Sequence, residues 1–81
     1  MMYTLDEIKI IMSSLHITQA KLAEWIGVSR VTTVKILQGK SSHMRIKRLA
    51  ITYVLDKYMD NQNLFFDRMN QKVVDIHELY Y

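Results

Sequence analysis

Residues 18–40 read TQAKLAEWIGVSRVTTVKILQGK, and this stretch predicts two short helices joined by a tight turn. Gly27 follows an apolar helical segment and supplies the positive φ of a helix C-terminal cap without steric cost. Thr18 and Ser29 have side chains suited to N-capping, so a helix is expected to begin after each of them. Gly39 closes the second helix. The chain therefore re-enters a helix within about three residues of leaving one.

The spacing of small and apolar residues indicates that the two helices cross at a wide angle. Helices that cross at roughly 90–120° over a short turn need a small side chain where their backbones approach, and Ala23 supplies it four residues before Gly27. The apolar residues that can touch across this angle are Leu22, Ile26, Val28 and Ile36. The second helix is expected at residues 30–38. This pattern is typical of a helix-turn-helix.

The same stretch resembles the helix-turn-helix of the lambdoid phage repressor and Cro family, also called Xre-type regulators. The family pattern is roughly TQ-x-x-LA-x-x-x-G-V-S, followed by a recognition helix that ends in G-K. The matching residues here are Thr18-Gln19, Leu22-Ala23, Gly27-Val28-Ser29 and Gly39-Lys40. The resemblance implies an all-α, five-helix, lambda-repressor-like domain with a C-terminal helical dimerisation segment.

Two positions depart from the family pattern. The family usually has an aliphatic residue where Thr33 stands and often a glutamate where Leu37 stands. Thr33 can bury its methyl group and bond its hydroxyl to a backbone carbonyl one turn back. We therefore expect the second helix to persist.

Composition places the chain among small globular proteins. Its 81 residues suffice for one domain with a small core, in which residues 1–60 form the helix-turn-helix core and residues 61–81 a packing segment. The absence of proline and the presence of only two glycines favour an all-α fold. The absence of cysteine excludes disulfides and thiolate metal sites. Without a long apolar run or a signal-peptide pattern, the chain is expected in the cytoplasm, away from membranes.

Positive charge is concentrated in the first part of the chain. Residues 1–48 hold eight Lys/Arg and three acidic residues, whereas residues 49–81 hold three Lys/Arg and five acidic residues. No acidic residue lies between Trp25 and Leu55. The basic residues in that interval are Arg30, Lys35, Lys40, Arg45, Lys47 and Arg48. Such a distribution predicts a surface that faces phosphates.

Two further helices are expected around the motif. The first covers residues 4–14, because Thr4 and Glu7 form a capping box. Its apolar stripe is Leu5, Ile8, Ile11, Met12 and Leu15. The other covers residues 43–60, with Ser42 as its N-cap. Its buried side is predicted to consist of Ile46, Leu49, Ala50, Tyr53, Val54 and Tyr58.

The C-terminal segment has an ambiguous pattern. The apolar residues that recur at spacings of 3, 4, 3 and 4 are Phe66, Met69, Val73, Ile76 and Tyr80. This spacing favours the seam of a helix that packs against another helix, and a second copy of the protein is the expected cover. Residues 72–80 also fit an alternating strand, and Cro-like relatives sometimes dimerise through a C-terminal strand. The alternative to dimerisation is that the segment folds back onto its own core.

The resemblance also implies which residues contact DNA. The base-reading positions correspond to Arg30, Val31 and Lys35, with Thr32 and Val34 as secondary candidates. The candidates for phosphate contact, from the family and from the basic stretch, are Gln19, Ser29, Lys40, Ser42, Arg45 and Arg48. No catalytic, metal or cofactor-binding pattern is present. The expected function is therefore a dimeric regulator, of repressor type, that binds an operator.

Two other functions fit the same motif. In an antitoxin, the helix-turn-helix binds the operator while the C-terminal segment holds a toxin. In a protein-interaction adaptor, the helix-turn-helix serves only as a scaffold. Salt-dependent binding to duplex DNA separates a regulator from an adaptor.

Overall fold

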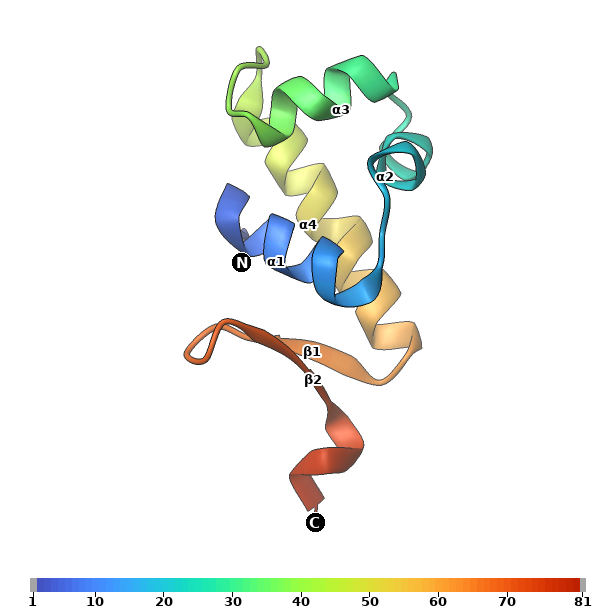
Figure 1. Ribbon diagram of the computed structural model, residues 1–81, viewed down its shortest axis with the longest axis vertical. Coiled ribbons are helices and arrows are strands. Elements are labelled where there is room, and N and C mark those ends of the chain that lie inside the picture. Colours follow the sequence, from blue (N-terminus) through green and yellow to red (C-terminus); the bar gives the residue numbers. More distant parts are fainter. Residues whose placement is uncertain (1, 81) are drawn as a thin grey trace.

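The computed structural model describes residues 2–80 (Figure 1). Its helices are α1 (Leu5–Leu15), α2 (Gln19–Ile26), α3 (Arg30–Leu37) and α4 (Met44–Asn61). These are followed by a hairpin of β1 (Leu64–Asp67) and β2 (Lys72–Asp75) and by the 3-10 helix η1 (Ile76–Tyr80). The molecule measures 43 × 22 × 18 Å, with α3 at one end of the long axis and the hairpin and η1 toward the other (Figure 1).

Side-chain caps start the first three helices, as the sequence predicts. The Thr4 hydroxyl accepts the Glu7 N–H at 3.1 Å, and a Glu7 carboxylate oxygen accepts the Thr4 N–H at 2.9 Å, which completes the capping box. Thr18 caps α2 and Ser29 caps α3 in the same way. Each cap satisfies a backbone N–H that has no partner within its helix.

Both glycines end helices with positive φ, as predicted. Gly27 has φ 72° after α2, and Gly39 has φ 75° after α3. Around Gly39, the Lys40 N–H donates to the Lys35 carbonyl at 2.9 Å and the Gly39 N–H donates to the Ile36 carbonyl at 2.9 Å. This pair of bonds is a Schellman motif, which turns the chain sharply out of α3.

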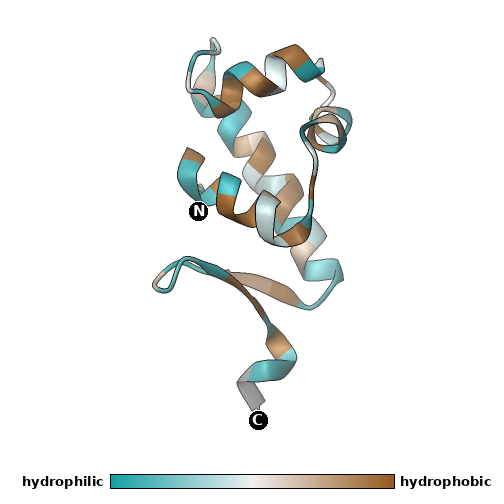
Figure 2. Ribbon diagram, viewed as in Figure 1, coloured by the Kyte–Doolittle hydropathy of each residue, from teal (hydrophilic) through white to brown (hydrophobic). Residues whose placement is uncertain are grey.

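The core lies where α1, α2 and α3 pack against α4, and apolar segments face one another across these helices (Figure 2). The largest fully buried side chains are Ile8, Ile11, Leu22, Ile36, Ile51, Leu55, Met59 and Thr33. The predicted stripe of the first helix is confirmed, because Ile8, Ile11 and Met12 are buried while Leu5 and Leu15 pack at the edge of the core.

The expectation of an all-α, five-helix fold is wrong. The described chain has four α-helices, and residues 64–75 form a two-stranded antiparallel sheet where a fifth helix was expected. In this sheet Phe66 pairs with Val73 and Phe65 with Val74. The chain turns because the Asp67 carboxylate accepts both the backbone and the side-chain N–H of Asn70, at 3.2 and 2.8 Å. Such Asx bonding stabilises a turn without glycine.

The predicted helical seam is therefore wrong as well. Phe66 and Val73 lie opposite each other in the sheet and face the core, with Phe66 buried and Val73 partly buried. Met69 lies in the turn and is 95% exposed, and Ile76 begins η1. Tyr80 ends η1, and its side chain lies outside the described part. A helix would place these residues on one side, whereas the hairpin distributes them over its strands, its turn and η1.

The predicted orientation of α4 and its predicted cap also need correction. The buried residues are Ile51, Thr52, Leu55 and Met59, whereas Ile46, Leu49 and Tyr53 are 68%, 56% and 65% exposed. Since α4 carries apolar residues on two sides, the sequence pattern did not decide which side is buried. Ser42 does not cap α4: His43 occupies that position with φ 54°, and no side chain bonds there.

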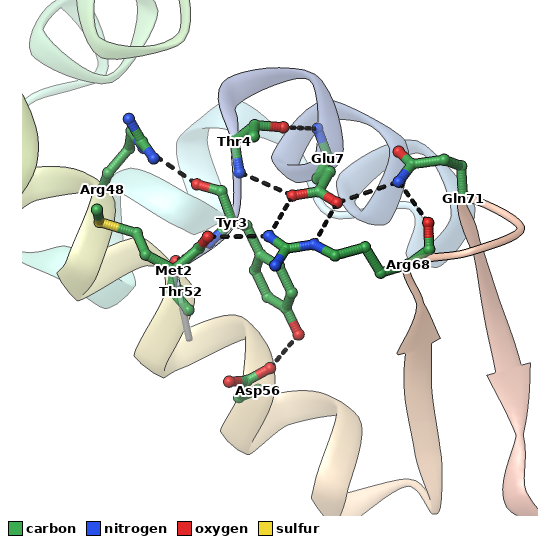
Figure 3. A network of polar contacts seen from close by, with 9 residues as sticks. All are labelled: Met2, Tyr3, Thr4, Glu7, Arg48, Thr52, Asp56, Arg68 and Gln71. Atoms are coloured by element: carbon green, nitrogen blue, oxygen red, sulfur yellow. Dashed lines mark hydrogen bonds and ion pairs between the residues drawn. The ribbon is translucent and has the colours of Figure 1, made fainter.

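A polar network joins the hairpin to the start of the chain (Figure 3). Arg68 donates Nε–H and Nη2–H to the two carboxylate oxygens of Glu7 at 2.7 and 2.6 Å, and Gln71 donates to one of them at 3.1 Å. Glu7 is only 4% exposed. The hydrogen bonds from Arg68, aided by the Thr4 N–H, lower the pKa of Glu7 to about 2 despite its burial.

Tyr3 extends this network to α4. Its N–H donates to the Thr52 hydroxyl at 3.0 Å, and its hydroxyl donates to the Asp56 carboxylate (Figure 3). Its ring meets the ring of Phe66 edge to face, with centroids 5.6 Å apart. Burial and the bond to Asp56 raise the pKa of Tyr3 above its usual value. The segment before α1 thus links α4 to the hairpin.

Candidate nucleic-acid interface

The predicted recognition helix α3 presents one side to the core and one to the surroundings. Thr33, Ile36 and Leu37 are buried, whereas Arg30 and Lys35 are exposed and Val31 is 64% exposed. Because the Val31 side chain is exposed, it does not contribute to the core of this chain. The three primary base-reading candidates therefore share the accessible side of α3.

Three hydrogen bonds order the first turn of α3, and the burial of Thr33, Ile36 and Leu37 fixes the rotation of the helix about its axis. The Ser29 hydroxyl accepts the Thr32 N–H at 3.1 Å and donates to the Thr32 hydroxyl at 3.0 Å. The Thr33 hydroxyl donates to the Ser29 carbonyl at 3.1 Å, and Thr33 is fully buried. The bond predicted for Thr33 is confirmed. Because Thr33 points into the core, Arg30 and Val31 point outward.

The secondary candidates are less accessible. Thr32 and Val34 are half-buried, and the hydroxyl of Thr32 already bonds to Ser29. At the other departure from the family pattern, Leu37 is 7% exposed and belongs to the core. These contacts leave Arg30, Val31 and Lys35 as the groups of α3 best able to reach another molecule.

The candidates for phosphate contact lie on several elements. Gln19 is the first residue of α2, where free backbone N–H groups of a helix favour anions. Ser29 is exposed at the start of α3, and Lys40 is exposed just beyond its end. Ser42 and Arg45 are exposed around the start of α4. The candidates thus flank α3 at both ends.

Two basic residues near the start of α4 have bonds within the chain that the sequence did not reveal. Arg48 donates Nε–H to the Tyr3 carbonyl at 3.0 Å and is half-buried (Figure 3). Lys47 donates to the Ser41 hydroxyl at 2.7 Å. Both bonds hold the loop and the chain start in place. Arg45 is therefore the better phosphate candidate on α4, because it is exposed.

The segment that contains α3 and the start of α4 carries positive charge and no acidic residue. The acidic residues that bound the acid-free interval are Glu24 and Asp56, of which Glu24 pairs with Lys21 at 3.7 Å and Asp56 bonds to Tyr3. In the described residues, the ion pairs are Lys21–Glu24 and Arg68–Glu7, so Arg30, Lys35 and Lys40 have no carboxylate partner. Unpaired cations that share one region attract phosphates.

No cluster of three or more His, Cys, Asp or Glu within residues 2–80 is arranged to hold a metal ion. None of the helices seen in this part of the chain combines the length and apolar character needed to cross a membrane. The chain matches no family model, no curated protein and no solved structure. The candidate interface therefore depends on the geometry and charge of this chain.

Proposed function

We propose that the protein is a sequence-specific DNA-binding regulator that represses transcription by occupying an operator as a dimer. The observation that carries the proposal is the first turn of α3, where Arg30 and Val31 are exposed within a segment that has no acidic residue. The bonds of Ser29 and Thr33 order that turn, and the burial of Thr33 turns Arg30 and Val31 outward. The resemblance to the Xre-type helix-turn-helix supports the same function.

In the proposed complex, α3 enters the major groove and α2 lies across the sugar-phosphate backbone. Arg30 has the donor geometry to bond O6 and N7 of guanine, and Val31 is suited to pack on a thymine methyl group. Lys35, one turn further along α3, reaches the next base or phosphate. Gln19 and Lys40 contact phosphates on either side and set the position of α3.

Repression follows from occupancy. A dimer that places two recognition helices about 34 Å apart reads two half-sites on one face of the duplex. The affinity then exceeds that of one half-site, because the second helix binds within the same complex. A protein bound in this way blocks access to the promoter that its operator overlaps.

Selection of bound sites from random duplex DNA, followed by titration at several salt concentrations, tests the proposal. We expect an enriched palindromic site and an affinity that falls steeply with salt, because Lys and Arg displace counterions from phosphates. Arg30→Ala should cost roughly 1–3 kcal/mol and relax the preference at one base pair. Lys40→Ala should weaken all sequences about equally.

Lys9→Ala provides the control, because Lys9 is exposed on α1, outside the proposed interface. This variant should bind as the unmodified protein does. Absence of enrichment together with flat salt dependence would contradict the proposal and favour an adaptor. A uniform loss of affinity in Arg30→Ala would show that another part of α3 reads the bases.

A further inference from the structure

Helix α4 has a second apolar side that nothing in the described chain covers. Its core side carries Ile51 and Leu55, which are fully buried. On the opposite side Ile46 is 68% exposed, Leu49 56% and Tyr53 65%. These are three of the five large hydrophobic residues that the described chain exposes. These three side chains are therefore not part of the core of a single copy.

The exposed side of α4 continues into a groove against α2. Trp25 of α2 stacks at a tilt on Tyr58 of α4, with ring centroids 5.1 Å apart. Beside this pair lies an open hollow of about 510 Å³, lined by residues of α2 and α4 that include Trp25, Ile26, Leu49 and Ala50. A contiguous apolar surface of this kind marks a protein–protein contact.

We propose that a second copy of the chain packs on this surface, with the two α4 helices parallel about a two-fold axis. We define the α4 face as Ile46, Leu49, Ala50, Tyr53 and Trp25. The inference deepens the proposed function, which requires two recognition helices held in one complex. It moves the dimer contact from the C-terminal segment to α4.

The spacing along α4 fits a parallel partner of identical sequence. Ile46, Ala50, Tyr53, Lys57 and Asp60 follow one another at intervals of 4, 3, 4 and 3. This is the seam of a two-stranded coiled coil, in which each helix presents the same side to its partner. In such a pair each seam residue meets its symmetry mate, so Ile46, Ala50 and Tyr53 pack against their own copies. The apolar seam therefore ends at Tyr53, because Lys57 and Asp60 bring like charges side by side at the far end of the helix.

The direction of α4 favours a parallel pair over an antiparallel one. Helix α4 starts near the end of α3 and runs along the molecule toward the hairpin (Figure 1). Parallel pairing keeps both copies of α3 at the same end of the dimer, whereas antiparallel pairing sends them to opposite ends. Each copy is 22 Å wide. In a dimer of two such copies side by side, the separation of the two α3 helices can match the spacing of about 34 Å between successive major-groove sites.

The size of the surface predicts a weak dimer. Helix α4, with 18 residues, is about 27 Å long, and α2, with 8 residues, is about 12 Å long; at a width of about 10 Å each, the two helices present about 390 Å² per copy. Stable interfaces bury about 800 Å² per partner. The free protein should therefore dimerise reversibly at micromolar or higher concentrations, and DNA should favour the dimer.

Sedimentation over a range of protein concentrations tests the contact without DNA. Tyr53→Glu should raise the dimer dissociation constant at least about tenfold, because the charge is buried without a partner. The matched control is Met69→Glu, which places the same charge on a side chain that is 95% exposed in the hairpin turn. Circular dichroism should show both variants folded. Dimerisation that survives Tyr53→Glu but is lost in Met69→Glu would overturn the inference in favour of the hairpin.

Cysteine cross-linking supplies a second measurement, and the chain has no cysteine of its own. Under mild oxidation, Ala50→Cys should form a disulfide-linked dimer, because a seam residue lies close to its symmetry mate. The matched control Ala20→Cys, an exposed alanine on α2, should not form a disulfide-linked dimer. Absence of cross-linking together with a monomer at all concentrations would overturn the inference and assign the α4 face to a different protein.

The two proposals fail separately. A protein that dimerises through the α4 face but ignores DNA contradicts the proposed function alone. A protein that selects an operator while Tyr53→Glu leaves its dimer and its affinity unchanged contradicts only the α4 interface.

Discussion

Bonds between residues close in the sequence stabilise the helix-turn-helix, whereas bonds between residues far apart in the sequence attach the C-terminal hairpin to the core. In residues 18–40 the decisive bonds join neighbours, such as Thr18 to Lys21 and Ser29 to Thr33. In the hairpin a local bond between Asp67 and Asn70 makes the turn, but the bonds that attach it to the core join distant residues: Arg68 and Gln71 both bond Glu7, which lies 61 and 64 positions earlier. A segment that local bonds specify can be predicted from its own residues, whereas a segment that distant partners specify cannot.

The largest expected effect comes from breaking the hairpin's ion pair. Arg68→Met leaves the buried carboxylate of Glu7 without its guanidinium, although Gln71 and the Thr4 N–H still donate to it, so the free energy of unfolding should fall by about 3 kcal/mol. The matched control is Lys21→Met, which breaks the exposed pair with Glu24 and should cost at most about 1 kcal/mol. Urea unfolding of both variants measures the difference. Equal losses would show that the hairpin's pair is no more important than a surface pair.

The second largest effect is expected from acid, which should weaken the bonds between Glu7 and the hairpin. The pKa of Glu7 is about 2 in the folded chain, against an ordinary value of 4.5. Its contribution is therefore complete above about pH 4.5 and is lost as the pH falls toward 2, because the unfolded chain takes up the proton first. The loss should amount to at most about 3 kcal/mol.

Unfolding of Glu7→Gln across the same pH range measures this contribution. This variant should be less stable at pH 7 but should lose less stability on acidification than the unmodified protein. Glu24→Gln is the control and should keep the full pH dependence. Both variants retain the half-buried Asp67, whose pKa is lowered by hydrogen bonds from Asn70. Parallel curves for Glu7→Gln and the unmodified protein would refute the assignment.

A change to the turn of the helix-turn-helix should have a smaller effect. Gly27 has φ 72°, and an added Cβ would meet no atom within 4 Å. Gly27→Ala should therefore cost about 1 kcal/mol, from the left-handed conformation alone. Thermal unfolding measures this loss, and Ala20→Gly on α2 gives a glycine–alanine reference in a regular helix. A loss of several kcal/mol would indicate a packing role for Gly27 that the structure does not contain.

The smallest effect is expected at Thr33. Thr33→Val keeps the shape of the fully buried side chain and removes the hydroxyl, while the Ser29 carbonyl still accepts the Thr33 N–H at 3.0 Å. The free energy of unfolding should change by less than about 1 kcal/mol. DNA affinity should also change little, because Arg30 and Val31 keep their orientation. A large loss of affinity with unchanged stability would show that the Thr33 hydroxyl helps to set the rotation of α3.

The predictions made from sequence succeeded where one residue and its near neighbours decide the structure. Thr4, Thr18 and Ser29 all cap helices as expected, and both glycines have positive φ. The orientation of α3 follows in turn from Thr33. The candidate site on α3 could therefore be placed from the sequence, although its function stays a proposal.

The predictions failed where tertiary contacts decide between patterns that fit the sequence equally well. Phe66, Met69 and Val73 fit a helical seam, yet Asp67 and Asn70 form a turn between them that contains no glycine. Gln71 even takes a positive φ of 52° there. On α4, apolar residues on two sides left the buried side undecided. Only the partners of Glu7 and Tyr3, far away in the sequence, resolve these choices.

We expect the ion pair between Arg68 and Glu7 to affect the order of folding as well. Its two residues are 61 positions apart, so the chain between them must close into a loop before the bond forms. Closing a long loop lowers the conformational entropy of the chain, whereas forming a single helix requires no such closure. The helix-turn-helix can form while the hairpin is still loose. The hairpin should dock last and open first, so its amide hydrogens should exchange with solvent at a lower free energy than those of α2 and α3.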